Sequence, residues 1–187
     1  TIYDALDRPV NKRTYNAATG GAIQNDIQYE YGKYSTALKY YQEWSGAVVP
    51  ATSRKVQYAY SFPSDGTTAL RRTSTTYTDG SVIDDVYNPG TDDTISRLSG
   101  QKRNGVWLFQ ESYLGLGRLV RRQYGTTSLE WTLVGTAADP ENNDYYVGLD
   151  RFGRIDDLVV KKPTDTINRY VYVYNYNSQV IRREDKV

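Results

Sequence analysis

The acidic side chains are the residues of this sequence that could most plainly support catalysis. The chain contains no histidine and no cysteine, which excludes thiol nucleophiles, disulfides, the usual zinc ligands and the common general base at neutral pH. Paired carboxylates remain, because two that face each other can hydrolyse a glycosidic bond. Most candidates lie in or beside predicted turns, where aspartate is common for backbone reasons, so we expect no catalytic residue, no cofactor and no enzyme activity. These candidates are Asp84, Asp85, Asp92, Asp93, Asp139, Glu141 and Asp144.

Two kinds of binding site are also conceivable. The segment 139–144, D-P-E-N-N-D, offers oxygen ligands for calcium but lacks the spacing and the glycine of an EF-hand loop. We therefore predict no metal site and keep calcium binding there as an alternative. Aromatic faces stack on sugar rings, so Trp44, Trp107 and Trp131 make a carbohydrate-binding module the alternative function.

A tyrosine-led motif recurs along the chain. Residues 3–10 read Y-D-A-L-D-R-P-V, residues 113–120 read Y-L-G-L-G-R-L-V, residues 149–156 read L-D-R-F-G-R-I-D and residues 174–181 read Y-N-Y-N-S-Q-V-I. Three more copies have a weaker match or a longer turn. The copies, numbered here as repeats one to seven, begin at Tyr3, Tyr31, Tyr60, Tyr87, Tyr113, Leu149 and Tyr174. Self-similarity at such a spacing predicts one stacked supersecondary unit, a single array over residues 1–187 with a polar insert at 136–144.

Each position of the motif has a predicted structural role. The leading tyrosines are expected to be core rungs, each stacked on its equivalent one repeat away. The short polar residue that follows, as in Asp4, Asn88, Asp150 and Asn175, is typical of an Asx-turn. The recurring arginine is expected to pack over a tyrosine of a neighbouring repeat or to pair with a turn aspartate. These arginines are Arg8, Arg71, Arg97, Arg118 and Arg154.

Basic doublets follow the motif in several repeats. Adjacent residues of a strand point to opposite faces, so half of each doublet should face solvent and half should face an acidic partner or line a wet cavity. The doublets are Lys12-Arg13, Lys102-Arg103, Arg121-Arg122, Lys161-Lys162 and Arg182-Arg183, and the acidic pairs available to them are Asp84-Asp85, Asp92-Asp93 and Asp156-Asp157.

The elements that carry these residues are predicted to be strands. The chain has 19 tyrosines against 3 phenylalanines and 3 tryptophans, a composition that favours half-covered sheets. Residues 23–31 and 168–176 alternate with period two, and residues 37–44 are short and aromatic enough to be a strand. Asp79-Gly80 and Asn104-Gly105 predict type I′ hairpin turns. Two strands per repeat give about fourteen in an all-β antiparallel meander, which strand twist should curl into a spiral.

Charge and hydrophobicity limit the kinds of partner that this chain is expected to bind. The net charge is +1, from 23 basic and 22 acidic residues that are interspersed, so we expect neither nucleic-acid binding nor an acidic tail. Eighteen consecutive apolar residues occur nowhere, which predicts no membrane insertion. A chain that begins at Thr1 and has no methionine is expected to be processed or part of something longer.

The motif resembles the YD-repeat, or Rhs-repeat, family, commonly written Y-D-x-x-G-R-L, in particular large surface proteins of planctomycetal bacteria. Tyr3-Asp4 with Arg8, Gly117-Arg118-Leu119 and Gly153-Arg154-Ile155 carry the likeness. The resemblance implies a β-hairpin strip that winds into a shell, as in teneurin-like receptors or around a toxin. Toxin shells of this kind end in a D-P-x-G self-cleavage motif, whereas residues 139–142 here read D-P-E-N. Seven repeats are also too few to close a shell.

These features predict a non-catalytic structural module at the bacterial cell surface or outside the cell. Adhesion, assembly and encapsulation are the roles that the resemblance implies, and a fragment of a toxin-encapsulating shell is an alternative. The expected partners are further YD repeats, of the same parent chain or of other subunits, that pair with open edge strands. Glycans are a possible second kind of partner.

Overall fold

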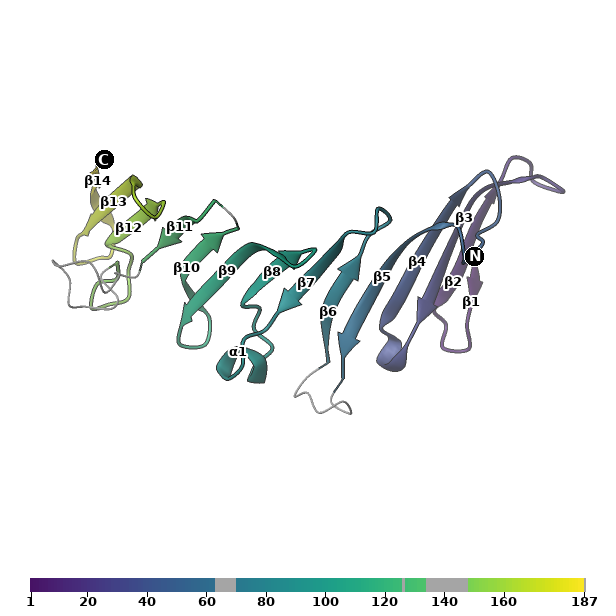
Figure 1. Ribbon diagram of the computed structural model, residues 1–187, viewed down its shortest axis with the longest axis horizontal. Coiled ribbons are helices and arrows are strands. Elements are labelled where there is room, and N and C mark those ends of the chain that lie inside the picture. Colours follow the sequence, from purple (N-terminus) through teal and green to yellow (C-terminus); the bar gives the residue numbers. More distant parts are fainter. Residues whose placement is uncertain (63–69, 126, 134–147, 187) are drawn as a thin grey trace. The chain divides into compact units, whose positions relative to one another are not determined.

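The computed structural model describes residues 1–62, 70–125, 127–133 and 148–186, and these form an antiparallel β-sheet with little helix (Figure 1). Fourteen strands follow one another in chain order, from β1 to β14, and each is hydrogen-bonded to the next. The all-β meander predicted from the repeats is confirmed. The polar insert 136–144 lies outside the described residues, and so do the calcium alternative at 139–144, the D-P-E-N segment, and Asp139, Glu141 and Asp144.

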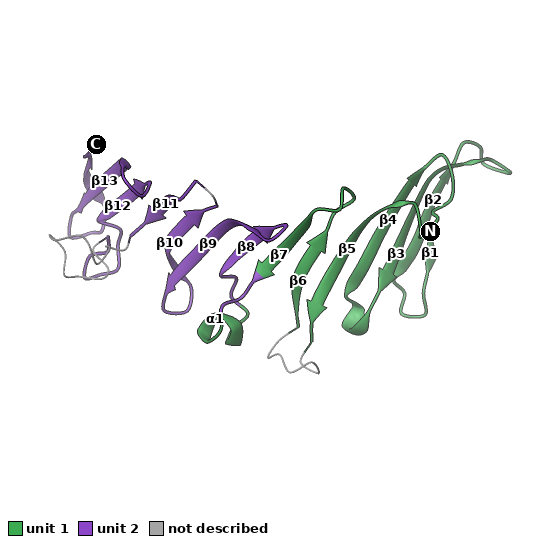
Figure 2. Ribbon diagram, in the orientation of Figure 1, with its two compact units in different colours: residues 1–85, 89–96 green, residues 86–88, 97–187 purple. Residues whose placement is uncertain are grey.

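The described residues group into two compact units, which Figure 2 shows in two colours. Unit 1 comprises residues 1–85 and 89–96, and unit 2 comprises residues 86–88 and 97–187. That both belong to a single array stays a prediction.

Unit 1 contains six complete strands, most of the seventh, and two short helical turns. Its elements are β1 Ile2–Tyr3, β2 Pro9–Tyr15, β3 Ile23–Tyr31, the 3-10 turn η1 Lys33–Ser35, β4 Ala37–Trp44, β5 Arg54–Ser61, β6 Arg71–Thr76, β7 Val82–Val86 and α1 Thr91–Thr94. The aromatic segment 37–44 is a strand, as predicted, and pairs with β3 on one side and β5 on the other. The helix α1 occupies the lengthened turn of repeat four.

Unit 2 contains the remaining strands. They are β8 Gly100–Arg103, β9 Val106–Leu114, β10 Arg118–Tyr124, β11 Leu129–Thr132, β12 Asp157–Lys161, β13 Thr166–Tyr174 and β14 Val180–Asp185. Strands β9 and β13 alternate with period two, which places the aromatic side chains of each strand on one face: Trp107, Phe109 and Tyr113 in β9, and Tyr170, Tyr172 and Tyr174 in β13. Among the described residues, no helix has the length and apolar character needed to cross a membrane.

The two predicted hairpin turns have different geometries. Asn104 and Gly105 both have positive φ, 50° and 80°, as a type I′ turn requires. In the other hairpin only Gly80 does, and the turn closes one residue wider, through a 2.8 Å hydrogen bond from Tyr77 N to Ser81 O. The type I′ prediction for Asp79-Gly80 is therefore wrong, because the Asp79 carboxylate accepts from Ser81 N at 2.8 Å and fixes the wider loop.

The buried positions are mostly polar. Among the described residues, the buried hydrophobic side chains are Tyr41, Val48, Val120 and Leu133. The buried polar ones are more numerous: Asn11, Asp26, Ser53, Thr75, Ser81, Ser99, Glu130 and Thr132. Most domains enclose a hydrophobic core between two packed layers of secondary structure. In this sheet, hydrogen-bonded side chains cover parts of the two faces. Ion pairs and turn contacts therefore position the functional residues.

Candidate functional site

The turn of repeat one is built by a single aspartate. Asp4 Oδ1 accepts hydrogen bonds from Leu6 N at 2.9 Å and Arg8 N at 3.0 Å, and Asp4 Oδ2 accepts from Arg8 Nε at 2.7 Å. This is the predicted Asx-turn, extended by an ion pair between positions i and i+4. The hydrogen bonds from Arg8 lower the pKa of Asp4.

Repeats six and seven form the same turn with different chemistry. Asp150 Oδ1 accepts from Phe152 N and Arg154 N, both at 2.9 Å, and its Oδ2 accepts from Arg154 Nε at 2.6 Å. In repeat seven, Asn175 Oδ1 accepts from the equivalent backbone groups at 3.0 and 2.9 Å, and its Nδ2 donates to Gln179 Oε1 at 2.9 Å. The Asn–Gln pair is thus a neutral copy of the Asp–Arg pair, and the turn geometry survives the loss of both charges.

In repeats one, six and seven, the residue before the arginine or glutamine has a left-handed backbone. Its φ is 59° at Asp7, 74° at Gly153 and 61° at Ser178. Ser35 takes the same place in repeat two, with φ 59°. Glycine adopts this conformation without steric cost, and aspartate tolerates it better than most residues. This requirement explains why the motif places a small or turn-forming residue at that position.

Three arginines of the motif reach the next repeat in the same way. The guanidinium carbons of Arg8, Arg97 and Arg154 lie 4.5, 4.2 and 4.4 Å from the ring centroids of the following leading tyrosines, which is the geometry of a cation–π contact. The same arginines donate to the next turn, to Ser35 Oγ at 3.2 Å, Gly115 O at 2.6 Å and Ser178 Oγ at 3.0 Å.

The tyrosine returns the contact through its hydroxyl group. In each case this hydroxyl donates to the carbonyl oxygen of the residue that follows the arginine. The three bonds join Tyr31 to Pro9 at 3.0 Å, Tyr113 to Leu98 at 2.9 Å and Tyr174 to Ile155 at 2.5 Å. We call the combined contact the arginine–tyrosine link. It joins repeat one to two, four to five, and six to seven.

This link differs from the predicted stacking of tyrosine on tyrosine. Equivalent residues of consecutive repeats are two strands apart, about 9.5 Å at the usual strand spacing, whereas stacked rings need about 4.5–7 Å between centroids. The strand spacing therefore argues against direct stacking of the leading tyrosines. The arginine over the ring, predicted for the motif arginines, is found in these three pairs of repeats.

The remaining motif residues have less regular surroundings. Arg71 donates from Nη1 to Asp93 O at 2.8 Å and pairs with the Asp93 carboxylate, so it too reaches the turn of the next repeat. Arg118 is exposed, with Nη1 at 3.7 Å from the position that a Cβ atom would take at Gly153. The leading Tyr3 is 55% exposed, Tyr60 lies 6.4 Å from the ring of Phe62, and Tyr87 is half-buried.

The three tryptophans differ in exposure. Trp44 ends β4 and is 61% exposed. The ring of Trp107 lies 4.5 Å from Lys102 Nζ, and Trp131 is half-buried on β11. A sugar platform at these positions stays a prediction, and Trp44 has the most open face of the three.

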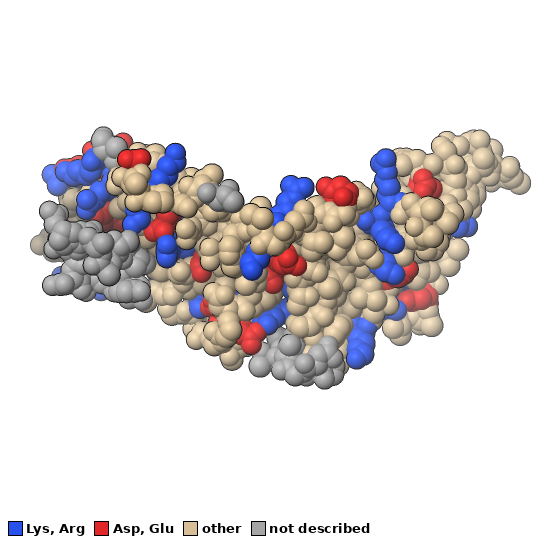
Figure 3. Space-filling model, viewed as in Figure 1, with Lys and Arg blue, Asp and Glu red and all other residues tan. Residues whose placement is uncertain are grey.

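The basic doublets do find acidic partners. Arg13 binds Asp26, Arg121 binds Glu130, and Arg122 binds Glu111. The acidic residues proposed from the sequence bind other arginines instead, because Asp85 pairs with Arg72, Asp93 with Arg71, and Asp157 with Arg169. Figure 3 shows the result on one face, where basic and acidic side chains lie interspersed.

Sequence reasoning missed the carboxylate with the most partners, Asp26 on β3. Its side chain is fully buried, and it accepts from Asn11 Nδ2 at 2.5 Å, from Arg13 Nε at 3.0 Å and from Gln28 Nε2 at 3.2 Å. The backbone N of Val48 also donates to it, at 2.8 Å, and so fixes the loop between β4 and β5 onto the sheet. Burial opposes ionisation, yet these hydrogen bonds lower the pKa of Asp26 to about 2.

Ion pairs engage two of the acidic candidates for catalysis in the described part of the chain. Asp85 and Asp93 are in ion pairs with Arg72 and Arg71. Burial, with repulsion from Asp150 and Asp157, raises the pKa of Asp156. Within the described ranges, no three side chains of the metal-binding types converge on one point.

Comparison with known proteins gives a likeness of fold. No family model and no curated protein matches this chain. Among solved structures it is similar to the Photorhabdus luminescens Tc holotoxin pore, with a TM-score of 0.52 and 9% identity over 100% of this chain. It is also similar to the TcdB2–TccC3–Cdc42 structure, with a TM-score of 0.50 and 9% identity over 97% of this chain. In both cases this chain spans 11% of the other chain's length.

Proposed function

We propose that this chain is a non-catalytic structural segment, part of the wall of a larger sheet of tyrosine-led repeats. The observation that carries the proposal is the arginine–tyrosine link, in which Arg8, Arg97 and Arg154 each lie over the tyrosine of the following repeat. The most regular side chains of the sequence are therefore used to join one repeat to the next. Side chains that act on a substrate would instead be expected to face an open site.

The proposed role of that wall is encapsulation or assembly. The motif resembles the YD repeat, and the solved structures with a similar fold are, by their titles, a Tc holotoxin pore and TcdB2–TccC3–Cdc42. Both facts favour a segment of a shell over an isolated adhesive domain. By the same argument, the proposed location is outside the cell or at the surface of a bacterium.

Unit 2 offers a surface suited to a further repeat. A hollow of about 850 Å³ lies beside the link between Arg154 and Tyr174, and its lining includes Tyr176 and Ile181. Tyr176 is fully exposed and Ile181 is 63% exposed. Apolar side chains gathered at an open surface are typical of an interaction site.

The turn of repeat two shows an aromatic contact between neighbouring repeats, although Tyr34 stays 69% exposed. There the ring of Tyr34 lies 6.0 Å from the ring of Phe62, which comes from repeat three, and Lys33 Nζ lies 5.6 Å from the same ring. We infer that an aromatic side chain of another repeat contacts Tyr176 and Ile181 in the same way. Its strand would pair with the outer edge of β14, Val180–Asp185, whose other edge pairs with β13.

Light scattering on the chain and two variants tests this proposal. We expect the wild type to self-associate as its concentration rises, through the surface around Ile181. Ile181→Asp places a charge there and should weaken association at least tenfold. The control is Ile167→Asp, since Ile167 is also exposed, at 45%, but does not line the hollow. Monodisperse monomers for all three proteins at every concentration would contradict the proposal.

A further inference from the structure

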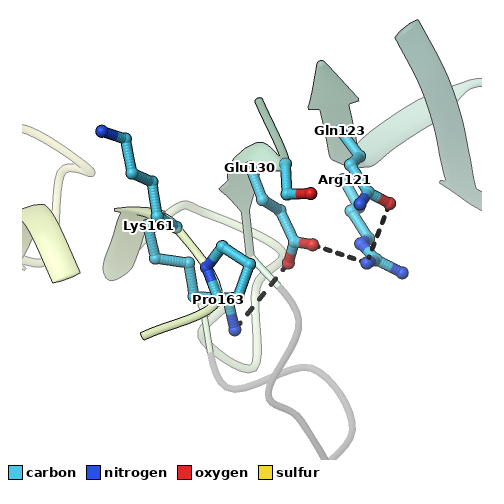
Figure 4. Close-up of a pocket in the computed structure, with 7 residues that line it drawn as sticks. Arg121, Gln123, Glu130, Lys161 and Pro163 are labelled. Atoms are coloured by element: carbon cyan, nitrogen blue, oxygen red, sulfur yellow. Dashed lines mark hydrogen bonds and ion pairs between the residues drawn. The ribbon is translucent and has the colours of Figure 1, made fainter. Parts of the chain in front are cut away.

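A second hollow in unit 2 is lined by none of the residues that form the arginine–tyrosine links. It has a volume of about 420 Å³ and lies over β10, β11 and β12 (Figure 4). Strand register explains its lining, because Gln123 faces Glu130 across one strand pair and Glu130 faces Lys161 across the next. Directly opposite residues point to the same face of a sheet. The lining residues are Arg121, Gln123, Ser128, Glu130, Lys161, Lys162 and Pro163.

Basic groups exceed acidic groups in this lining. Arg121, Lys161 and Lys162 carry three positive charges against the single negative charge of Glu130, which leaves a net charge of +2. Glu130 is 7% exposed and lies between the two cations that it binds, with Arg121 Nη2 at 2.5 Å and Lys161 Nζ at 3.8 Å. Figure 4 shows Arg121 and Lys161 reaching Glu130 from opposite sides. Lys162 is exposed and has no ion-pair partner among the described residues.

The two bound cations keep capacity for another ligand. The distance of 3.8 Å from Lys161 Nζ to Glu130 is long for a charge-assisted hydrogen bond, so this ammonium group can turn toward a second anion. The Arg121 side chain is 43% exposed although it holds Glu130. Gln123 Oε1 accepts from Arg121 Nη2 at 3.4 Å, which leaves the amide N–H groups of Gln123 as donors. Ser128 adds a hydroxyl group to the same lining.

We propose that this hollow binds a phosphate group. A phosphate monoester carries about two negative charges at pH 7 and three strong acceptor oxygens, which match a lining with net charge +2 and with donors on β10, on β12 and in the loops beside β11 and β12. Arginine and lysine are the side chains that most often bind phosphate. The volume of about 420 Å³ lies within the range of small-molecule sites, about 300–1,000 Å³. The ligand is therefore either free phosphate or a small phosphorylated molecule such as a sugar phosphate.

Calorimetric titration separates these two sources. The probes are inorganic phosphate, a hexose phosphate and the corresponding free hexose, at pH 7.5 and constant ionic strength. We expect saturable binding of the two phosphate compounds and none of the hexose. Tighter binding of the hexose phosphate identifies a phosphorylated small molecule, and equal binding identifies free phosphate. Because the site prefers the dianion, affinity should fall as the pH is lowered through about 6, the second pKa of a phosphate monoester.

Variants then assign the binding to this hollow. Lys161→Gln and Lys162→Gln each remove one charge, and each should weaken phosphate binding about tenfold, the effect of losing one charge-assisted hydrogen bond. Lys162→Gln is the safer variant for folding, since the Lys162 side chain is exposed. Lys12→Gln is the matched control, because Lys12 is an exposed lysine of unit 1, and it should leave binding unchanged.

Three results would overturn the proposal. The first is no saturable binding of either phosphate compound to the wild-type chain. The second is an equal loss of binding in Lys12→Gln and Lys162→Gln, which would show attraction by overall charge alone. The third is unchanged affinity in both Lys161→Gln and Lys162→Gln, which would place the phosphate elsewhere.

Discussion

Asp26 in unit 1 and Glu130 in unit 2 are buried carboxylates on the sheet, and they differ in what surrounds them. Asp26 is fully buried, bound by a single cation, Arg13, and closed over by the loop that carries Val48. Glu130 is 7% exposed, shared by two cations, and open to a hollow of about 420 Å³. Asp26, whose charge is matched by one cation and which is shielded from solvent, stabilises its unit. Glu130 is surrounded by more positive than negative charge and borders a hollow, which leaves a site for another anion.

The largest expected effect is that of removing the charge of Asp26. Asp26→Asn leaves Arg13 without its carboxylate and weakens the hold on the Val48 loop. A hydrogen bond to a charged group contributes about 1.5–3 kcal/mol, so we expect a loss of about 2–3 kcal/mol in the free energy of unfolding, measured by urea denaturation. The control is Asp7→Asn, at an exposed aspartate, which should change stability by less than about 0.5 kcal/mol. Equal stability of the two variants would contradict this account of Asp26.

The pH dependence of stability is the next largest effect. The pKa of Asp26 is about 2 in the folded chain, below the ordinary value of 3.8 expected when the chain is unfolded. Its ionised form therefore stabilises the fold fully above about pH 4, and this contribution of about 2 kcal/mol is lost as the pH falls toward 2. Denaturation curves between pH 2 and 5 should show this slope in the wild type and a flatter slope in Asp26→Asn. Identical slopes would show that Asp26 is not the group responsible.

Glu130→Gln should destabilise the chain less than Asp26→Asn does, and it should strengthen phosphate binding. The carboxylate holds Arg121 and Lys161, but both cations remain hydrated in the hollow after its loss, so the cost should be about 1–2 kcal/mol. The net charge of the lining rises from +2 to +3, and phosphate affinity measured by calorimetry should rise several-fold. A loss of stability as large as that of Asp26→Asn would remove the distinction between a closed and an open site.

Removing one hydroxyl group tests the smallest of these contributions. Tyr174→Phe deletes the bond from the tyrosine hydroxyl to Ile155 O, which measures 2.5 Å, and keeps the ring under Arg154. We expect a loss of about 1 kcal/mol, the usual net value of one hydrogen bond, by thermal denaturation. The comparison variant is Tyr176→Phe, at a fully exposed tyrosine, which should be neutral.

Local features could be predicted from the sequence, and long-range partners could not. The Asp4 to Arg8 turn follows from four residues of chain, and so does the type I′ turn at Asn104-Gly105. The partner of Arg13 required the register between β2 and β3, which places Arg13 directly opposite Asp26. Direct stacking of the leading tyrosines is disfavoured because equivalent residues are two strands apart, a distance that a repeat period alone does not reveal.

The candidate binding hollow shows the same limit. Arg121 and Lys161 belong to two of the basic doublets, and a wet cavity was one predicted place for such residues. No motif of the sequence singled out Glu130. It lies in the short strand β11, and its partners are brought to it by the pairing of β11 with β10 and β12. Two segments far apart in the sequence must pair with β11 before the site exists.

A double-mutant cycle on Arg154 and Tyr174 tests the arginine–tyrosine link most directly. The variants are Arg154→Leu, Tyr174→Leu and the double substitution, and the free energy of unfolding is measured for each and for the wild type. The guanidinium carbon of Arg154 lies 4.4 Å from the ring centroid of Tyr174, so we predict a favourable coupling energy of about 0.5–1.5 kcal/mol. Fully additive losses, with a coupling energy of zero, would contradict the claim that this contact joins one repeat to the next.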